Sequence, residues 1–324
     1  MSDKIKNVLV TGGAGYIGAH MVRLLLENGY KPVVFDNLST GYRDYVPAGV
    51  HFIKGDLCNY GDIQKAFKTY KICAVMHFAA AIVVPESVSN PLKYYENNIV
   101  GSVNLLKAMI QAGVDKIIFS SSACVYGNAL RNPITENEPL KVENPYGATK
   151  VMVEQILRDL GRAGYINFII LRYFNVAGLG FLRKTGIKRR QPTHLIPRVM
   201  DVVSGRKRML GVFGTDYPTP DGSCIRDYIH VLDICEAHLL ALKALCDKRV
   251  VNDIFNLGDG KGFSVKEVIA VASEITGKVI RVKVEPRRPG DCPSAVASFS
   301  KAKRILGWIP KRRLKDIIQS TGVR

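Results

Sequence analysis

A tyrosine and a lysine four residues apart, Tyr146 and Lys150, are the pair in this chain whose types and spacing best suit proton transfer. Asn144 and Pro145 stand just before them as a typical N-cap and first helical residue, so the pattern predicts a helix with both side chains on one face. A phenol ionises at about pH 10 and is a poor base at neutral pH. A neighbouring ammonium favours the phenolate, which predicts that Lys150 makes Tyr146 a usable general base.

Three hydroxyl groups come earlier in the chain, where an apolar run ends. The run Ile117 to Phe119 predicts a strand, and Ser120, Ser121 and Ser122 follow it. Open α/β sheets bind ligands beyond the carboxyl ends of their strands, so we expect one of these hydroxyls to complete a proton relay. A tyrosine and a lysine at this spacing also occur by chance on helix surfaces, and the pair gains its meaning from this context.

A glycine-rich segment near the start of the chain predicts an anion site. The apolar run Val8 to Val10 leads through Thr11 to Gly18 directly into an apolar helical pattern. The glycines of the segment are Gly12, Gly15 and Gly18. This pattern suits a tight turn, a close approach of the backbone to a pyrophosphate, and close packing of helix on strand. We expect the amides of Tyr16 and Ile17, at the start of the helix, to bind the phosphates.

An acidic residue follows at the distance expected of a dinucleotide site. Asp36 ends the next apolar run, roughly 20 residues beyond the turn. Its carboxylate is expected to accept hydrogen bonds from the adenosine ribose and to repel a 2′-phosphate, which favours NAD over NADP. Asp56 follows a further apolar run and is a candidate ligand of the adenine amine; taken alone, a loop-capping role explains it better.

The order of the apolar runs predicts the fold. Continuous runs rich in valine and isoleucine alternate with longer segments of helical periodicity at 17–27, 91–111 and 145–160. This order predicts an α/β fold with a doubly wound parallel sheet of the Rossmann type. The rhythm breaks after about residue 175. We therefore expect an NAD-binding domain at 1–174 and a smaller α/β substrate domain, mostly 175–324, that is partly interleaved with the first.

Composition limits the functional classes. The 324 residues include 46 Lys and Arg against 28 Asp and Glu, a net charge of +18 that attracts polyanions. The basic residues are spread along the chain without interleaved aromatics, which favours solvated surfaces over a nucleic-acid groove. The seven cysteines form no CxxC pair, and no apolar stretch is long enough for a membrane span. We expect a soluble cytoplasmic protein with free thiols that binds no metal, nucleic acid or membrane.

Together these motifs resemble the extended short-chain dehydrogenase/reductase superfamily, and within it the UDP-glucose 4-epimerases. The resemblance covers nearly the whole chain and rests on the glycine-rich segment, the serine run and the Tyr146-xxx-Lys150 pair. Supporting stretches are Phe35-Asp36-Asn37-Leu38, His77-Phe78-Ala79-Ala80, Tyr94-Tyr95-Glu96-Asn97-Asn98, Leu171-Arg172-Tyr173-Phe174-Asn175, Asp216-Tyr217-Pro218-Thr219, Arg226-Asp227-Tyr228-Ile229-His230-Val231, Asn256-Leu257-Gly258 and Pro286-Arg287-Arg288-Pro289-Gly290-Asp291.

The resemblance implies a reaction without net oxidation. Tyr146 takes the proton of the sugar 4-hydroxyl as hydride leaves C4 for NAD, the 4-keto sugar turns in the pocket, and the hydride returns to its other face. Ser122 matches the catalytic hydroxyl, and Lys150 also matches a ribose ligand. Related dehydratases and decarboxylases carry an acidic residue soon after the serine run. Ala123 to Gly127 contains no carboxyl group, which leaves epimerisation.

The resemblance also completes the set of site residues. The cofactor residues are Gly12, Gly15, Tyr16, Ile17, Gly18, Asp36, Asn37, Asp56, Leu57, Phe78, Ala79, Asn97 and Phe174, besides Tyr146 and Lys150. The UDP-sugar residues are Asn175, Leu195, Phe213, Arg226, Tyr228, Arg288, Asp291 and Ala295, besides Ser122 and Tyr146. Arginine suits the diphosphate because its fork pairs bidentately with phosphate oxygens. The helices at 91–111 and 145–160 resemble those of a dimer's four-helix bundle, so a homodimer is expected.

Some positions depart from the family pattern. Ile82 stands where some members have a lysine near the nicotinamide ribose, and His194 stands where asparagine is usual. The segment from Leu179 to Pro192 is more basic than expected. Ala295 occupies the place of a gating residue that is tyrosine in enzymes limited to unsubstituted sugars. We therefore expect N-acetylated UDP-hexosamines as substrates alongside UDP-glucose and UDP-galactose.

Two other functions stay open at this point. The shared motifs specify the cofactor and the diphosphate better than the sugar, so an epimerase for another UDP sugar, such as a uronic acid or a pentose, fits them too. Some proteins of this fold class sense dinucleotides or bind RNA without catalysis, and the charge of +18 is compatible with such a role. Those proteins usually lose the catalytic pair, which is present here.

Overall fold

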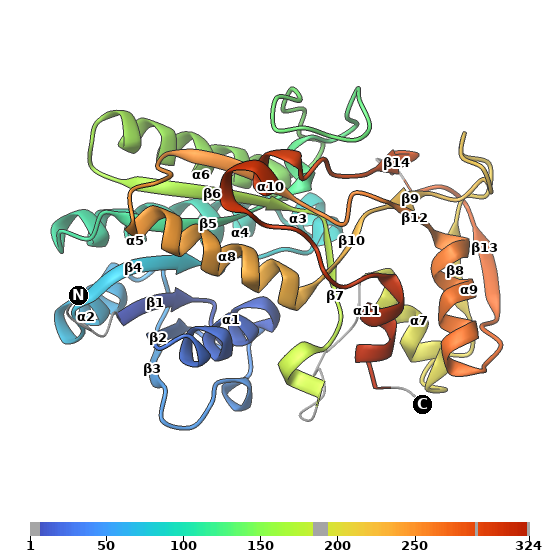
Figure 1. Cartoon of the computed structure of the whole chain (residues 1–324), viewed down its shortest axis with the longest axis horizontal. Helices are drawn as coiled ribbons and strands as arrows, with labels where there is room; N and C mark the ends of the chain where they lie inside the picture. The colour runs from blue at the N-terminus through green and yellow to red at the C-terminus, as the bar shows by residue number, and fades with distance from the viewer. Residues whose placement is uncertain (1–6, 184–193, 289–290, 323–324) are drawn as a thin grey trace. The chain divides into compact units, whose positions relative to one another are not determined.

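The structure, a computed structural model shown in Figure 1, describes residues 7–183, 194–288 and 291–322. The chain divides into two units, neither of which is a continuous stretch. The first comprises residues 1–125, 142–172 and 235–255, and the second comprises 126–141, 173–234 and 256–324. A boundary between folding domains at residue 174 stays a prediction, because compactness does not show which segments fold on their own.

A seven-stranded sheet forms the centre of the first unit, in the order β11-β6-β5-β4-β1-β2-β3. The pairs that join β3, β2, β1, β4 and β5 are parallel. The strands are β1 (Asn7–Thr11), β2 (Lys31–Asp36), β3 (His51–Lys54), β4 (Ile72–His77), β5 (Lys116–Ser122), β6 (Asn167–Tyr173) and β11 (Asp253–Leu257). Strand order and pairing confirm the predicted doubly wound α/β fold.

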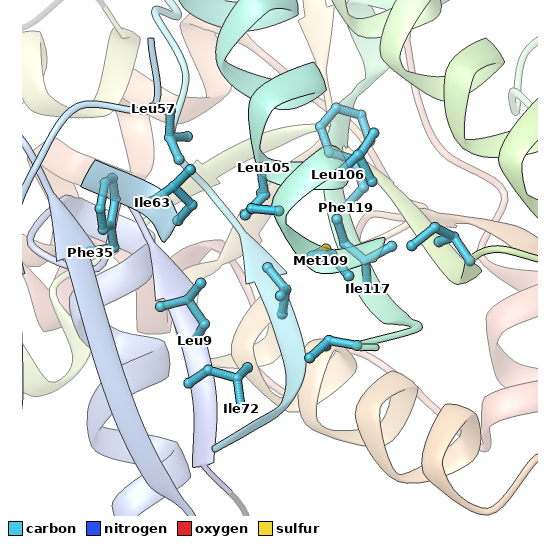
Figure 2. Packing of buried hydrophobic residues seen from close by; sticks show 14 of the residues in the cluster. Leu9, Phe35, Leu57, Ile63, Ile72, Leu105, Leu106, Met109, Ile117 and Phe119 are labelled. Atoms are coloured by element: carbon cyan, nitrogen blue, oxygen red, sulfur yellow. The ribbon is translucent and has the colours of Figure 1, made fainter. Parts of the chain in front are cut away.

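Helices cover both faces of this sheet. On one face, strand residues such as Leu9, Phe35 and Ile117 pack against the helices in a buried cluster (Figure 2). The helices of this face are α2 (Tyr60–Thr69), α5 (Gly101–Gln111) and α6 (Pro145–Arg162). Val8 and Val10 point to the opposite face and are equally buried. Contact on both faces explains why the apolar runs are continuous.

The opposite face is covered by α1 (Tyr16–Glu27) and α8 (Val231–Cys246). Cys235 of α8 lies with its Sγ 3.9 Å from the carbonyl oxygen of Ile17 on α1. His238, one turn further along α8, reaches the hydroxyl of Ser120 on β5. The first unit is completed by the short helix α3 (Val84–Ser89) and the 3-10 turns at Arg43–Tyr45 and Ala123–Val125.

The predicted helix at 91–111 contains a π turn. It runs as α4 (Pro91–Tyr94), the π segment η2 (Tyr95–Val100) and α5. A π turn adds a residue to the helical repeat and often marks a functional site. It changes little in the apolar pattern, so the helix was predictable and the turn was not.

The second unit joins short strands to helices around a smaller apolar core. Its strands are β7 (Asn175–Ala177), β8 (Leu210–Phe213), β9 (Ile225–Arg226), β10 (Tyr228–His230), β12 (Phe263–Ser264), β13 (Val282–Glu285) and β14 (Ser294–Ala295). Its helices are α7 (Leu195–Val203), α9 (Val265–Thr276), α10 (Ser300–Leu306) and α11 (Leu314–Ser320), with a 3-10 turn at Gly180–Arg183. The core lies mainly between α7, α9 and α11.

A buried carboxylate organises the strand connections of this unit. Asp227, between β9 and β10, accepts the backbone N–H groups of Asp259, Gly260 and Ala297 at 2.6, 3.0 and 3.0 Å. Strands β7 and β10 pair in parallel, as do β8 with β13 and β9 with β14. The chain segments that follow β11 and β14 are thereby fixed to the turn after β9.

Three further expectations concern the cysteines, membrane-spanning segments and the basic segment at 179–192. All seven cysteines are free thiols, as predicted. No helix among the described residues combines the length and apolarity that crossing a membrane requires. Of the basic residues noted in the segment 179–192, Lys184, Lys188, Arg189 and Arg190 lie outside the described residues.

Candidate active site

The helix that carries Tyr146 and Lys150 begins as the sequence predicts. Asn144 is the N-cap, its Oδ1 accepting the N–H of Gly147 at 2.8 Å, and Pro145 is the first helical residue. A side chain at position 147 has no room, because a Cβ there would lie 2.8 Å from the carbonyl oxygen of Cys124. The start of α6 is therefore pressed against the turn after β5.

Lys150 and Tyr146 lie together in the interior, 4% and 8% exposed. The Lys150 Nζ is 5.8 Å from the centre of the Tyr146 ring and 4.8 Å from that of Phe119. It donates a hydrogen bond to the carbonyl oxygen of Ser120 at 2.8 Å. Burial lowers the pKa of Lys150 to about 8, against the opposing charges of Glu154 and Cys124. The ammonium thus persists at neutral pH by a small margin.

The three serines at the end of β5 differ in their partners. Ser120 shares a hydrogen bond of 3.2 Å with His238 Nε2, and Ser121 donates to Glu154 Oε1 at 2.6 Å. Ser122 Oγ accepts the N–H of Cys124 at 3.2 Å. Among the described residues, nothing takes up the hydroxyl proton of Ser122, which therefore remains available to a ligand. This difference favours Ser122 as the hydroxyl of the predicted relay.

The glycine-rich turn has the geometry of a dinucleotide cradle. Gly12 has φ of +69°, and a Cβ there would lie 2.7 Å from the backbone nitrogen of Ala79. A Cβ at Gly18 would lie 2.2 Å from the Gly12 carbonyl oxygen. Helix α1 begins directly after the N-cap Gly15, which makes no side-chain cap, and the N-terminus of a helix suits an anion. The residues present fit a pyrophosphate, as NAD requires.

Asp36 both shapes this turn and ends β2. Its two carboxylate oxygens accept the N–H groups of Ala14 at 3.0 Å and Leu38 at 2.8 Å. Burial raises its pKa, while these two backbone hydrogen bonds oppose the rise. Leu38 has φ of 62°, which a leucine rarely adopts and which its hydrogen bond to Asp36 helps to hold. A ribose bound at Asp36 would therefore contact a carboxylate that already orders the backbone of Ala14 and Leu38.

Asp56 has the loop-capping role that the sequence suggested. Its Oδ1 accepts the N–H of Cys58 at 2.8 Å, and its Oδ2 accepts Asn37 Nδ2 at 2.9 Å. Burial pushes the pKa of Asp56 up, but the hydrogen bonds from Asn37 and Cys58 bring it below its ordinary value. Leu57 is buried and packs beside Gly101. The structure thus links Asn37 to Asp56, two residues predicted to bind the cofactor.

The remaining predicted cofactor residues of the first unit follow β4 and lie in the π turn. Phe78 donates its N–H to Thr11 at 3.0 Å, and its ring lies 4.8 Å from that of His238. Ala79 adjoins Gly12. Asn97 Nδ2 donates to Asn98 Oδ1 at 2.8 Å. Phe174 belongs to the second unit, so its contact with the cofactor stays a prediction.

Two polar residues that the sequence did not single out support this region. Asn98 accepts the N–H of Ala81 at 2.8 Å and donates to Thr149 Oγ1 at 3.0 Å, which joins the π turn to the loop after β4 and to α6. His77 bonds to Thr11 Oγ1 at 2.7 Å and Ser102 Oγ at 2.9 Å, and burial lowers its pKa to about 3. His77 is therefore neutral. Asn98 and His77 both belong to stretches that support the family resemblance, but the sequence predicted no role for either of them.

Two of the predicted UDP-sugar ligands lie across from each other on β9 and β14. Ala295 is in register with Arg226. Arg226 Nη2 is 3.2 Å from Asp291 Oδ1, and its Nη1 donates to the Cys292 carbonyl at 2.8 Å. Three predicted residues, Arg226, Asp291 and Ala295, are thus gathered at one strand pair. Arg226 therefore pairs with Asp291, whereas its sequence neighbour Asp227 binds backbone N–H groups.

The other predicted sugar-nucleotide residues lie at three further places in the second unit. Arg288 lies with its guanidinium carbon 3.6 Å from the centre of the Phe213 ring at the end of β8. Asn175 is in register with Tyr228, and its Nδ2 donates to the Asp227 carbonyl at 3.1 Å. Leu195 is the first residue of α7 and packs at the edge of the apolar core.

Comparisons with known proteins identify the family of this chain. A profile of the NAD dependent epimerase/dehydratase family matches residues 8–258. The UDP-glucose 4-epimerase of Azospirillum brasilense is 46% identical over 314 residues, which cover 97% of this chain and 90% of the relative.

Solved structures give the same result. UDP-glucose 4-epimerase from Brucella ovis in complex with NAD has a TM-score of 0.94 at 42% identity, covering 98% of this chain and 99% of that chain. The UDP-Glc/GlcNAc 4-epimerase from Campylobacter jejuni has a TM-score of 0.85 at 40% identity, covering 98% of each chain. The chain therefore belongs to the NAD dependent epimerase/dehydratase family, and it is similar over nearly its full length to UDP-glucose 4-epimerases.

Proposed function

We propose that this protein interconverts UDP-glucose and UDP-galactose by NAD-dependent epimerisation at C4 of the sugar. The observation that supports it most is the buried pair of Tyr146 and Lys150, in the same unit as a glycine-rich cradle for a dinucleotide. Relatives named UDP-glucose 4-epimerase share this chain's length and fold, and one of them was crystallised with NAD.

The side chains of the first unit move the proton. When bound, NAD supplies the acceptor for the hydride that leaves C4 and the donor for its return. Tyr146 accepts the proton of the 4-hydroxyl as the carbonyl forms, and gives it back to the same oxygen when the carbonyl is reduced. Ser122 donates a hydrogen bond to that oxygen. Lys150 stabilises the phenolate with its positive charge.

The second unit binds the nucleotide. Arg226 and Arg288 carry two positive charges, of which Asp291 neutralises one through its ion pair with Arg226. The remaining positive charge suits a diphosphate, and each guanidinium can pair with two of its oxygens. The UDP-sugar site is completed by Phe213, Asn175, Tyr228 and Leu195. Phe174 is assigned to the cofactor.

Ala295 makes room for a larger group on the sugar. Ala295 on β14 is in register with Arg226 on β9, and a tyrosine in place of its methyl side chain would occupy far more space. One similar structure is named a UDP-Glc/GlcNAc 4-epimerase. We therefore include N-acetylated UDP-hexosamines among the substrates. Ala295→Tyr should suppress turnover of UDP-N-acetylglucosamine while sparing UDP-glucose, and an equal loss on both substrates argues against this assignment.

A homodimer is part of the proposal. The helices α4, α5 and α6 of the first unit, with the π turn between the first two, expose several large apolar side chains, namely Leu92 (71%), Val100 (46%), Val103 (42%) and Met152 (44%). Covering them with a second copy would remove apolar surface from water. Light scattering on a gel-filtration column should give about twice the mass of one chain, and Val103→Lys should halve it.

The test of the reaction itself is product analysis. Purified protein incubated with UDP-galactose should form UDP-glucose, and denaturation of the protein should release NAD. Conversion of a different UDP sugar with UDP-galactose left unchanged would assign the chain to another epimerase. Retained NAD without turnover of any UDP sugar would make it a non-catalytic dinucleotide-binding protein.

A further inference from the structure

A buried ion pair lies one helical turn beyond Lys150. Glu154 follows Lys150 by four residues on α6 and pairs with Arg172 of β6, whose Nε donates to Oε1 at 2.9 Å and Nη2 to Oε2 at 2.5 Å. Both side chains are 1% exposed. A buried ion pair seldom stabilises a fold more than apolar residues of the same volume would. Because this ion pair lies beside the helix turn that carries Tyr146 and Lys150, we expect a role for it other than stabilising the fold.

The strand that holds Lys150 also holds this pair. Ser120 accepts the Lys150 ammonium on its carbonyl oxygen at 2.8 Å, and Ser121 donates its hydroxyl to Glu154 Oε1 at 2.6 Å. Ser120 and Ser121 are neighbours at the end of β5. The ammonium and the carboxylate are thus fixed to consecutive residues of one strand, as well as to one face of α6.

Lys150 is buried deeply enough that its charge depends on its neighbours. Tyr146 and Glu154 face it from its own helix, His77 from β4, and Cys124 from the turn after β5. Arg172 and Arg158 both pair with Glu154. His77 is neutral. Burial lowers the pKa of Lys150, and the Glu154 carboxylate is the largest influence that raises it again.

We propose that Glu154 is a positioning residue that keeps the Lys150 side chain charged and directed at Tyr146, with Arg172 holding the carboxylate in place. The two arms of Arg172 occupy both oxygens of Glu154, and no direct hydrogen bond between Glu154 and Lys150 occurs among the described residues. Lys150 is therefore attracted by the carboxylate without being turned away from the phenol. Arg172 in turn fixes the position of the Glu154 carboxylate through these two hydrogen bonds. This role presupposes the proposed epimerase reaction.

The test compares two substitutions that separate charge from shape. Glu154→Gln keeps the shape and removes the charge. The alkaline limb of its pH profile, where turnover of UDP-galactose falls with rising pH, should therefore lie about one pH unit below that of the wild type. Glu154→Asp keeps the charge and shortens the side chain, so its alkaline limb should stay within about 0.3 unit of the wild type. An unchanged limb in the glutamine variant, or an equal shift in both variants, overturns the role.

A double substitution covers the case in which Glu154→Gln fails to fold. Glu154→Gln combined with Arg172→Met leaves no unpaired charge in the interior, and exchanges of this kind are often tolerated. Its alkaline limb should also move to lower pH, since Glu154 and not Arg172 is the charge that raises the Lys150 pKa. A wild-type limb in the folded double variant overturns the role. Wild-type protein that fails to convert UDP-galactose refutes the proposed function instead.

Discussion

The residues proposed for proton transfer and those proposed for the diphosphate hold their charges in different ways. In the first unit, Tyr146 and Lys150 are 8% and 4% exposed, and the ammonium is fixed on a strand carbonyl. In the second unit, Arg288 is exposed and rests on the Phe213 ring. Buried, oriented charges act most strongly on a transition state, whereas exposed charges mainly add binding. Changes in the first unit should therefore lower kcat, and changes in the second should raise KM.

Loss of the Lys150 charge should give the largest fall in kcat among the variants of the first unit. We expect Lys150→Met to lower kcat for UDP-galactose by roughly 10³-fold, because the Tyr146 phenolate loses its ammonium partner. KM should change by less than about threefold. Lys65→Met is the matched control, since its side chain is 77% exposed, and it should keep wild-type kcat. A rise in KM as large as the fall in kcat would remove the distinction between the two units.

A side chain at Gly12 should weaken the binding of NAD to the glycine-rich turn. Gly12→Ala adds a Cβ only 2.7 Å from the backbone of Ala79, at a φ of +69°. We expect retained NAD to fall at least about tenfold, because both the strain and the clash displace the turn. Gly113→Ala is a matched control: its φ is +67°, and nothing lies within 4 Å of the added Cβ. NAD released on denaturation measures both, and equal retention would show that the clash is irrelevant.

On the nucleotide side, Arg288→Ala should act on binding alone. Loss of a charged hydrogen bond to the diphosphate should raise KM roughly 10- to 100-fold and leave kcat within about threefold. Arg287→Ala is the neighbouring control, because that side chain is engaged by Asp216 at 2.8 Å and by the Tyr217 ring. Steady-state kinetics on both variants would contradict the assignment if Arg287→Ala raised KM as much.

The pH dependence of kcat and KM should show a smaller difference between the two units. Burial lowers the pKa of Lys150 to about 8, so kcat should fall above that pH by about tenfold per unit, while KM stays nearly constant. Stability should change in the other direction. Between about pH 8 and 10.5 the unfolded chain binds a proton at Lys150 that the folded chain lacks, so this residue's contribution to the free energy of unfolding rises with pH. Comparing wild type with Lys150→Met by denaturant unfolding checks the sign.

Local patterns in the sequence were sufficient for much of the fold and the site. The continuous apolar runs gave the strands, since burial on both faces leaves no polar alternation. Asn144 and Pro145 marked the start of α6, and capping is a local interaction that three residues decide. The glycines of the turn were recognisable because only that residue fits their close contacts.

Interactions between distant segments were not predictable in this way. The π turn at Tyr95–Val100 leaves the apolar pattern of a helix intact. Glu154 looks in the sequence like the partner of an ordinary exposed pair with Lys150 at helical spacing. Only the packing of α6 on β6 shows that it is buried against Arg172. His77 likewise becomes a structural residue through Thr11 and Ser102, which are far from it in the chain.

The most direct test is the rate at which Tyr146→Phe, still carrying NAD, converts UDP-galactose to UDP-glucose. Phenylalanine keeps the ring and removes the group that exchanges the proton, so conversion should be slower by at least about 100-fold with NAD content unchanged. Conversion at the wild-type rate would show that another group accepts the proton and that the buried tyrosine and lysine do not perform the chemistry.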